Sequence, residues 1–131
     1  MPTRKSPIEE PRTEGLRFRR REHLKRRAEI TVVFKKGRVA ACPGARLFFL
    51  ENGLPHNRVV FTFARNYGNA VERNRARRLG REAYRLLRPR LRGGFDLVLL
   101  VYPSETVTFA ARQKQLKTLV SKAGLYRPAP V

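Results

Sequence analysis

Arginine side chains recur between residues 70 and 87 at a spacing that would let one helix hold a polyanion. They stand at positions 73, 75, 77, 78, 81 and 85. At about 100° of rotation per residue, one narrow face of such a helix is apolar and consists of Ala76, Leu79, Gly80, Ala83, Leu86 and Leu87. The opposite face consists of Asn74, Arg77, Arg78, Arg81 and Arg85, with Arg73 and Arg75 flanking the apolar stripe. Because a guanidinium is a planar fork of donors that suits phosphate oxygens, we predict a helix that is anchored on one side and binds phosphates with the other.

A charged helical face is often only a solvated surface, and two observations favour binding instead. The charged run contains arginine and no lysine, and the whole chain has a formal net charge of +20, from 30 Lys+Arg against 10 Asp+Glu. Such an excess repels itself in the free protein, which is typical of a protein with a strongly anionic partner. Nucleic acid is the first candidate and an anionic membrane the second. No apolar run approaches the ~18 residues of a membrane span and the N-terminus lacks the apolar core of a signal peptide, so we expect a cytoplasmic protein.

The chain offers little for bond cleavage by its own side chains. A protein nuclease normally needs clustered carboxylates that hold a divalent metal, or a histidine base. Asp96 is the single aspartate and falls inside a predicted buried strand, while the glutamates are dispersed. His23 and His56 are far apart in sequence, and the single cysteine, Cys42, excludes an internal disulfide and a multi-cysteine metal site. We therefore predict a binding protein with no catalytic or metal-ligating residues of its own.

Hydrophobic periodicity and turn residues outline the elements that would position these residues. The predicted helices span residues 24–36, 70–87 and 109–123. The predicted strands span residues 38–42, 46–51, 58–64 and 95–102, and the last is apolar nearly throughout, as in a strand buried on both faces. The order αβββαβα predicts a single α+β domain, with helices covering a small sheet. The predicted boundaries are a disordered basic arm at 1–21, the domain at 22–126 and a loose tail at 127–131.

Aromatic side chains on the first helix and the second strand form another candidate site. Phe34 is near the end of that helix, and Phe48 and Phe49 point to opposite faces of one strand because successive side chains alternate. Core packing accounts for most of the aromatic residues. An exposed aromatic in a groove between helix and sheet would stack on an unpaired base, which contributes ~1–3 kcal/mol. Alternation leaves open which of Phe48 and Phe49 faces outward.

Residues 68–84, Gly-Asn-Ala-Val-Glu-Arg-Asn-Arg-Ala-Arg-Arg-Leu-Gly-Arg-Glu-Ala-Tyr, resemble the signature of the bacterial ribonuclease P protein family. That family is marked by G-N-A-V-x-R-N-R-x-K/R-R, followed by an arginine and an aromatic residue, and the order of elements agrees from about Leu24 to Tyr126. The resemblance implies a sheet with helices on it and a left-handed β-α-β crossover, opposite to the usual hand.

The resemblance also implies a function as the protein partner of a large catalytic RNA. The RNA cleaves precursor tRNA to leave the mature 5′ end, with magnesium bound by the RNA and no cofactor on the protein. The protein holds the 5′ leader of the precursor. Self-association of the protein is not expected to be required.

Two sets of residues match the family pattern position by position. The catalytic-RNA set, on the signature helix, consists of Arg73, Asn74, Arg75, Arg77, Arg78 and Arg81. The leader set consists of Ile30, Phe34, Phe48 or Phe49, Arg65 and Asn66. Within the leader set, Ile30 stands where phenylalanine is common, and Asn66 stands where the family usually has a lysine.

Two other functions fit part of the sequence. A ribosomal protein of similar size, charge and fold would also carry an arginine helix, but it would not need a cleft for a leader. A protein-only nuclease would cut precursor tRNA unaided, and the scarcity of carboxylates argues against it.

Overall fold

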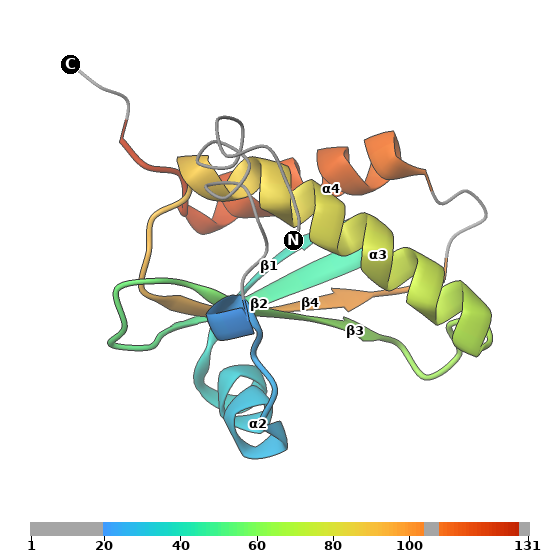
Figure 1. Cartoon of the computed structure of the whole chain (residues 1–131), viewed down its shortest axis with the longest axis horizontal. Helices are drawn as coiled ribbons and strands as arrows, with labels where there is room; N and C mark the ends of the chain where they lie inside the picture. The colour runs from blue at the N-terminus through green and yellow to red at the C-terminus, as the bar shows by residue number, and fades with distance from the viewer. Residues whose placement is uncertain (1–19, 104–107, 129–131) are drawn as a thin grey trace, which may run out of the picture.

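A four-stranded mixed sheet with helices on both faces forms the described part of this computed structural model, residues 20–103 and 108–128 (Figure 1). The strands are β1 (Arg38–Cys42), β2 (Ala45–Glu51), β3 (Arg58–Phe63) and β4 (Phe95–Val101). The helices are α2 (Arg27–Lys36), α3 (Ala70–Leu87) and α4 (Phe109–Ala123), with short 3-10 helices η1 (Arg20–Glu22) and η2 (Arg88–Arg90). The predicted α+β class and the order αβββαβα are confirmed, and the bounds of α3 and α4 are those predicted.

The sheet has the order β1-β2-β4-β3, so the apolar strand β4 lies inside it and β3 forms one edge. β4 pairs with β2 in the antiparallel sense and with β3 in the parallel sense. All its residues except Leu100 are buried, as predicted for a strand covered on both faces. β3 and β4 are adjacent, parallel and joined through α3, which makes a β-α-β crossover. Its left hand stays an expectation from the resemblance.

The two faces of the sheet are covered unequally. α3 and α4 lie on one face and α2 lies on the other (Figure 1). The larger core lies under α3 and α4, where side chains of all four strands meet those of both helices. The smaller core lies under α2 and consists of Leu24, Val33 and Val98, with Ile30, Phe48, Leu50 and Val60 packed against it.

Asp96, the single aspartate, is part of the framework of the fold. It is buried at the start of β4, directly opposite Arg58 of β3. Arg58 donates to both carboxylate oxygens, at 2.9 Å from Nε and 2.7 Å from Nη2, and Asn52 donates to Oδ1 at 2.9 Å. Arg58 also forms a salt bridge of 3.4 Å with Glu29 of α2. The hydrogen bonds to Asp96 are the main cause that raises the pKa of Arg58, and Glu29 acts in the same direction. The cluster of charged side chains joins β3, β4 and α2.

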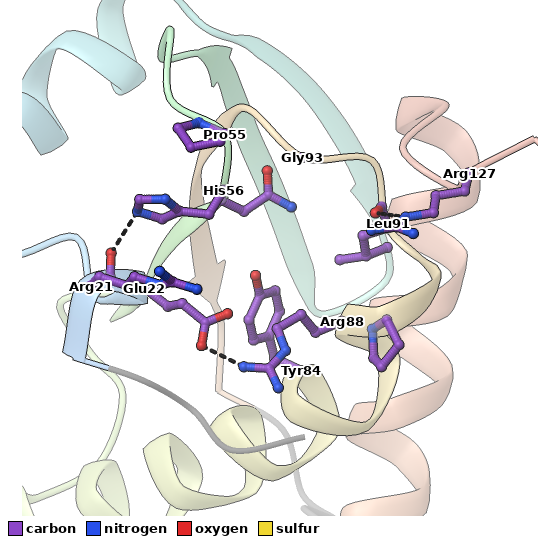
Figure 2. Close-up of a pocket in the computed structure, with 11 residues that line it drawn as sticks. Arg21, Glu22, Pro55, His56, Tyr84, Arg88, Leu91, Gly93 and Arg127 are labelled. Atoms are coloured by element: carbon purple, nitrogen blue, oxygen red, sulfur yellow. Dashed lines mark hydrogen bonds and ion pairs between the residues drawn. The ribbon is translucent and has the colours of Figure 1, made fainter. Parts of the chain in front are cut away.

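The described part of the chain begins at Arg20, shortly before the predicted start of the domain at residue 22. Arg20 and Arg21, assigned by sequence to the arm, form η1 with Glu22, whereas residues 1–19 lie outside the described part. Glu22 is buried and forms a salt bridge with Arg88, at the end of α3. Figure 2 shows the two side chains pointing toward each other, and His56 Nε2 lies 3.2 Å from the carbonyl oxygen of Arg21. Because burying Glu22 without Arg88 would be costly, this pair explains why η1 docks on the domain.

At the other end of the described part, Arg127 contacts the segment after α3. Arg127, assigned by sequence to the loose tail, donates from its backbone N to Arg90 O at 2.8 Å and from Nε to Leu91 O at 2.9 Å. These bonds satisfy carbonyl groups of the segment after α3. Residues 129–131 of the tail lie outside the described part.

Replacing Asp96 with alanine is expected to lower the free energy of unfolding by about 3 kcal/mol, because it leaves the Arg58 guanidinium without its main partner. Urea denaturation followed by circular dichroism measures this loss. The control is Glu82→Ala, which removes the exposed Glu82–Arg85 pair and should cost less than about 1 kcal/mol. Equal losses for the two variants would contradict the role of Asp96.

Candidate nucleic-acid interface

The arginine helix α3 begins with a capping box built from the signature residues themselves. The Asn69 side chain accepts a hydrogen bond from Glu72 N, and Glu72 Oε1 accepts one from Asn69 N, both at 2.9 Å. Gly68 has φ of +35°, and a Cβ there would lie 2.4 Å from Glu72 Oε1. The Gly-Asn pair therefore lets the chain turn sharply into the helix and satisfies its first backbone N–H groups.

The buried stripe of α3 holds the helix against the sheet and α4. It consists of Ala76, Gly80, Ala83, Tyr84 and Leu87. A Cβ on Gly80 would lie 2.9 Å from Cδ1 of Phe61, so glycine lets the helix approach β3 closely. Leu86, predicted on the apolar face, is 39% exposed instead. The buried face of α3 is rotated from the predicted one so that it includes the Tyr84 ring. Leu86 then lies at the border with solvent.

The arginines of the catalytic-RNA set divide into two supported and three exposed side chains. Arg73 donates to Tyr67 O at 3.1 Å and to Arg65 O at 3.2 Å, which ties it to the turn before the helix. Arg77 donates to Asn74 Oδ1 at 2.8 Å, and its Cζ lies 5.3 Å from the centre of the Phe63 ring. The three exposed members are Arg75, Arg78 and Arg81.

No arginine of this set takes part in a salt bridge within residues 20–103 and 108–128. The acidic residues on α3 have other partners, since Glu72 caps the helix and Glu82 binds Arg85. The guanidiniums thus keep their charge and most of their donors available. Along one helix, such a row matches the spacing of a phosphate backbone far better than it matches an isolated anion.

An aromatic pair lies on the other face of the sheet, under α2. The rings of Phe34 and Phe48 meet edge to face, with centroids 4.8 Å apart. Phe34 is 37% exposed, while Phe48 and Ile30 are half-buried against the small core. An edge-to-face contact holds both rings in place, so part of the Phe34 ring remains open to a ligand.

Phe49 does not join this group. It is 5% exposed in the larger core, on the face covered by α3 and α4, where it packs against Phe95 with ring centroids 6.4 Å apart. Of the two neighbouring phenylalanines on β2, Phe48 is therefore the one on the face of the sheet that α2 covers, together with Ile30 and Phe34. Phe49 is removed from the leader set as a core residue.

Arg65 and Asn66, the polar members of the leader set, are exposed in the turn between β3 and α3. Arg65 is tied to the arginine helix through its carbonyl oxygen, which accepts from Arg73. The turn thus places both side chains next to the start of α3, at the end of the edge strand.

Some residues of the interface have no local signal in the sequence. The Phe63 ring lies beside the Arg77 guanidinium, and the backbone carbonyl of Tyr67 accepts from Arg73. The two rings pack with centroids 4.9 Å apart, and the sequence indicated only core packing for Phe63. His23 and Lys25 line a groove at the edge of β3 together with Ile30, Arg77 and Arg81. Only tertiary contacts bring these segments together, and no motif marks His23 or Lys25.

Two groups that differ in position have shifted pKa values, His23 beside the groove at β3 and Cys42 on β1. Burial, then the charges of Arg81 and Lys25, lower the pKa of His23, with Glu22 acting in the opposite direction. Burial raises the pKa of the Cys42 thiol, which keeps it protonated and unreactive. Across the described ranges, no three His, Cys, Asp or Glu side chains gather closely enough to hold a metal ion.

A polar cavity near α3 belongs to the framework of the fold. It lies beside Tyr84 and is shown in Figure 2. Its acidic group, Glu22, is bound to Arg88. Asn57 donates to Arg92 O at 2.8 Å and accepts from Phe95 N at 2.8 Å. Because Glu22 and Asn57 already have partners within the protein, the residues that line this cavity hold η1 against the sheet.

A sheet that carries an arginine-lined helix on one face and a half-open aromatic pair on the other defines a small RNA-binding protein. The Ribonuclease P family model matches residues 18–124. The chain therefore belongs to the ribonuclease P protein family.

Relatives and solved structures agree with this assignment. A Ribonuclease P protein component from Natranaerobius thermophilus is 38% identical over 103 residues, 78% of this chain and 90% of the relative. Another from Clostridioides difficile is 32% identical over 110 residues, 82% of this chain and 96% of the relative. The RNase P protein from Staphylococcus aureus has a similar fold, with a TM-score of 0.73 at 22% identity over 81% of this chain and 98% of that one. The RNase P protein from Thermotoga maritima gives a TM-score of 0.65 at 26% identity, over 73% and 92%.

The family establishes the general function. Its members are protein subunits of an endoribonuclease whose catalytic activity lies in the RNA, and the catalytic RNA is accordingly the partner of this chain. The ribosomal-protein alternative is not supported. In the part of the chain that the structure describes, no helix is long and apolar enough to cross a bilayer.

Removing the cap of the arginine helix should destabilise the free protein. Asn69→Ala is expected to lower the free energy of unfolding by about 1 kcal/mol, and Asn69→Asp should retain most of it because aspartate also caps helices. Thermal or urea unfolding without RNA checks this. Asn74→Ala, inside the same helix, is the control and should cost clearly less than Asn69→Ala. The same loss at both positions would contradict the capping role.

Proposed function

We propose that this protein holds both RNAs of the processing reaction at once, the catalytic RNA on α3 and the 5′ leader of precursor tRNA under α2. The observation that carries the proposal is the pairing of two unlike surfaces on one small sheet. One has guanidiniums that no carboxylate neutralises among residues 20–103 and 108–128, and the other has the Phe34–Phe48 ring pair with part of Phe34 exposed. The first suits the crowded phosphates of a folded RNA, and the second suits unpaired bases.

The chemistry that follows from these surfaces is binding and charge neutralisation. Magnesium held by the RNA would supply the activated water and the stabilisation of the leaving oxygen. The chain would contribute by lowering repulsion where phosphates of the catalytic RNA and the leader come close together. Its effect on cleavage should therefore be largest when magnesium is scarce. The cytoplasm is the compartment that this role implies.

The direct test is reconstitution with the catalytic RNA of the same organism and a precursor tRNA. Cleavage at limiting magnesium is measured with RNA alone, protein alone and both together. We expect cleavage only when the RNA is present, with a clear acceleration by the protein that fades at high magnesium. Cleavage by the protein alone, or no acceleration under any condition, would contradict the proposal.

Phe34→Ala is expected to weaken binding of leader-bearing precursor tRNA to the holoenzyme by about tenfold, as for the loss of one stacked base. Binding of mature tRNA should be unchanged, because it lacks the leader. Equilibrium binding of the two RNAs gives the comparison. Val32→Ala, an exposed apolar residue of the same helix, serves as the control. Equal weakening for precursor and mature tRNA would assign Phe34 a packing role instead.

Replacing Arg75 and Arg78 together with alanine should weaken binding to the catalytic RNA and reduce the slope of log affinity against log salt by about 1 to 2. The reason is that both side chains are exposed on α3 and lack salt-bridge partners in the described residues. The control removes the same charge elsewhere, through Arg90→Ala with Lys117→Ala, both exposed and outside the signature. A slope that changes equally in both double variants would show that overall charge matters and the helix does not.

A further inference from the structure

Arg112, in the first turn of α4, is a buried charge without a counter-charge. It is 4% exposed, and it forms no salt bridge with any residue that the structure describes. The other buried charged side chains, Glu22 and Asp96, are each paired with an arginine. Burying an unpaired charge costs stability, and an apolar side chain in such a place is often as stable or more stable. The presence of arginine here therefore needs a reason other than folding.

The Arg112 guanidinium is connected to the turn between β1 and β2. Its Nη1 donates to Gln115 Oε1 at 2.8 Å, and Gln115 Nε2 donates to Pro43 O at 3.0 Å. The Gln115 amide lies directly against this turn, because a Cβ on Gly44 would be 2.6 Å from its Nε2. Nε of Arg112 is buried and has no hydrogen-bond partner within residues 20–103 and 108–128. These contacts fix the direction of the guanidinium without satisfying all its donors.

Tyr67 links Arg112 to the start of the arginine helix. Burial lowers the pKa of Arg112, and Tyr67 acts in the opposite direction, in part through a hydrogen bond between the two side chains. Tyr67 is buried in the larger core, with its ring centroid 4.9 Å from that of Phe63. A residue of α4 thus contacts the turn between β3 and α3 from inside the protein.

The backbone of this turn orients Arg73 of the catalytic-RNA set. Tyr67 N donates to Ala64 O at 2.9 Å, which closes the turn, and Tyr67 O accepts from Arg73 Nε at 3.1 Å. The second carbonyl that Arg73 reaches, Arg65 O at 3.2 Å, belongs to the same turn. A shift of Tyr67 would therefore move both acceptors and change the direction of the Arg73 guanidinium.

We propose that Arg112 is a positioning residue for the binding of the catalytic RNA. It holds Tyr67 in place from inside the protein, and Tyr67 in turn sets the direction of Arg73 on the surface of α3. The inference rests on the proposed function, in which Arg73 contacts the catalytic RNA, and extends it to α4, which lies outside the signature. A charge that costs stability in one helix thus serves the binding surface of another.

Replacing Arg112 with methionine separates this role from packing. Arg112→Met keeps an unbranched side chain and removes the charge, so the urea midpoint of the full-length free protein should stay level or rise. Affinity for the catalytic RNA of the same organism should nevertheless fall about threefold to tenfold, as for one weakened hydrogen bond to a charged group. A urea midpoint that falls in parallel with the affinity would make Arg112 a packing residue and overturn the inference.

Arg90→Met is the control for the loss of one positive charge. Arg90 is exposed in η2 and lies outside the signature. Its replacement should lower the affinity for the catalytic RNA clearly less than Arg112→Met does. An equal loss in the two variants would show that net charge matters and the position of Arg112 does not.

Tyr67→Phe tests the link with a smaller change. It removes the hydroxyl that interacts with Arg112 and keeps the ring beside Phe63. We expect a loss of catalytic-RNA affinity similar to that of Arg112→Met, and little further loss when the two changes are combined. If Arg112→Met does not fold, Tyr67→Phe takes its place in every comparison. Full affinity in Tyr67→Phe would overturn the inference.

A double-mutant cycle with Arg73 shows whether the effect passes through that arginine. Arg73→Ala alone should weaken binding, and Arg112→Met added to it should cost little more, because the side chain that Arg112 positions is gone. Full additivity of the two losses would contradict the proposed path. A loss in Arg73→Ala without one in Arg112→Met would overturn the inference and leave the proposed function intact. Unchanged affinity in Arg73→Ala would count against both.

Discussion

The close contact between α3 and the edge strand β3 is the constraint on which the interface depends. At Gly80 the helix backbone meets the Phe61 ring so closely that a Cβ would lie 2.9 Å from it. Arg77 lies about one turn before this point and Arg81 directly follows it, so the distance of both arginines from the sheet depends on the absence of one side chain. A larger residue at 80 would lift the helix and move the guanidiniums away from β3, without altering any arginine. The glycine of the signature therefore acts through geometry.

The distribution of carboxylates explains how a chain of net charge +20 both folds and keeps its cations available. In the described part, Glu22 and Asp96 neutralise Arg88 and Arg58, Glu72 caps α3, and Glu82 binds Arg85. These carboxylates stabilise contacts between elements of the fold, and none of them forms a salt bridge with an arginine of the catalytic-RNA set. The repulsion that remains on α3 costs stability in the free protein and is relieved when phosphates bind. Folding and RNA binding thus use separate groups of charges.

Local patterns in the sequence predicted the elements well and their mutual placement only in part. The bounds of α3 agree because Asn69, the 3.6-residue stripe and the Pro89 region are all local signals. Alternation placed Phe48 and Phe49 on opposite faces, but the choice between them depends on which face α2 covers. Leu86 was misplaced because Tyr84, through its ring, takes the buried position, which a rule based on aliphatic spacing does not anticipate. The docking of η1 depends on the Glu22–Arg88 pair across 66 residues of sequence, for which no local signal exists.

The resemblance supplied what local physics could not, namely the catalytic RNA as the partner of this chain. The structure adds a connection between the two residue sets, because Ile30 of the leader set and Arg77 and Arg81 of the catalytic-RNA set line the same groove. The two faces of a sheet meet at its edge strands, and β3 is the edge strand on the side away from β1 and β2. His23 and Lys25 line this groove as well. The edge strand would otherwise be a liability for aggregation, and the bridge between His23 and Val59 and the bond from Leu24 N to Val59 O cover part of it.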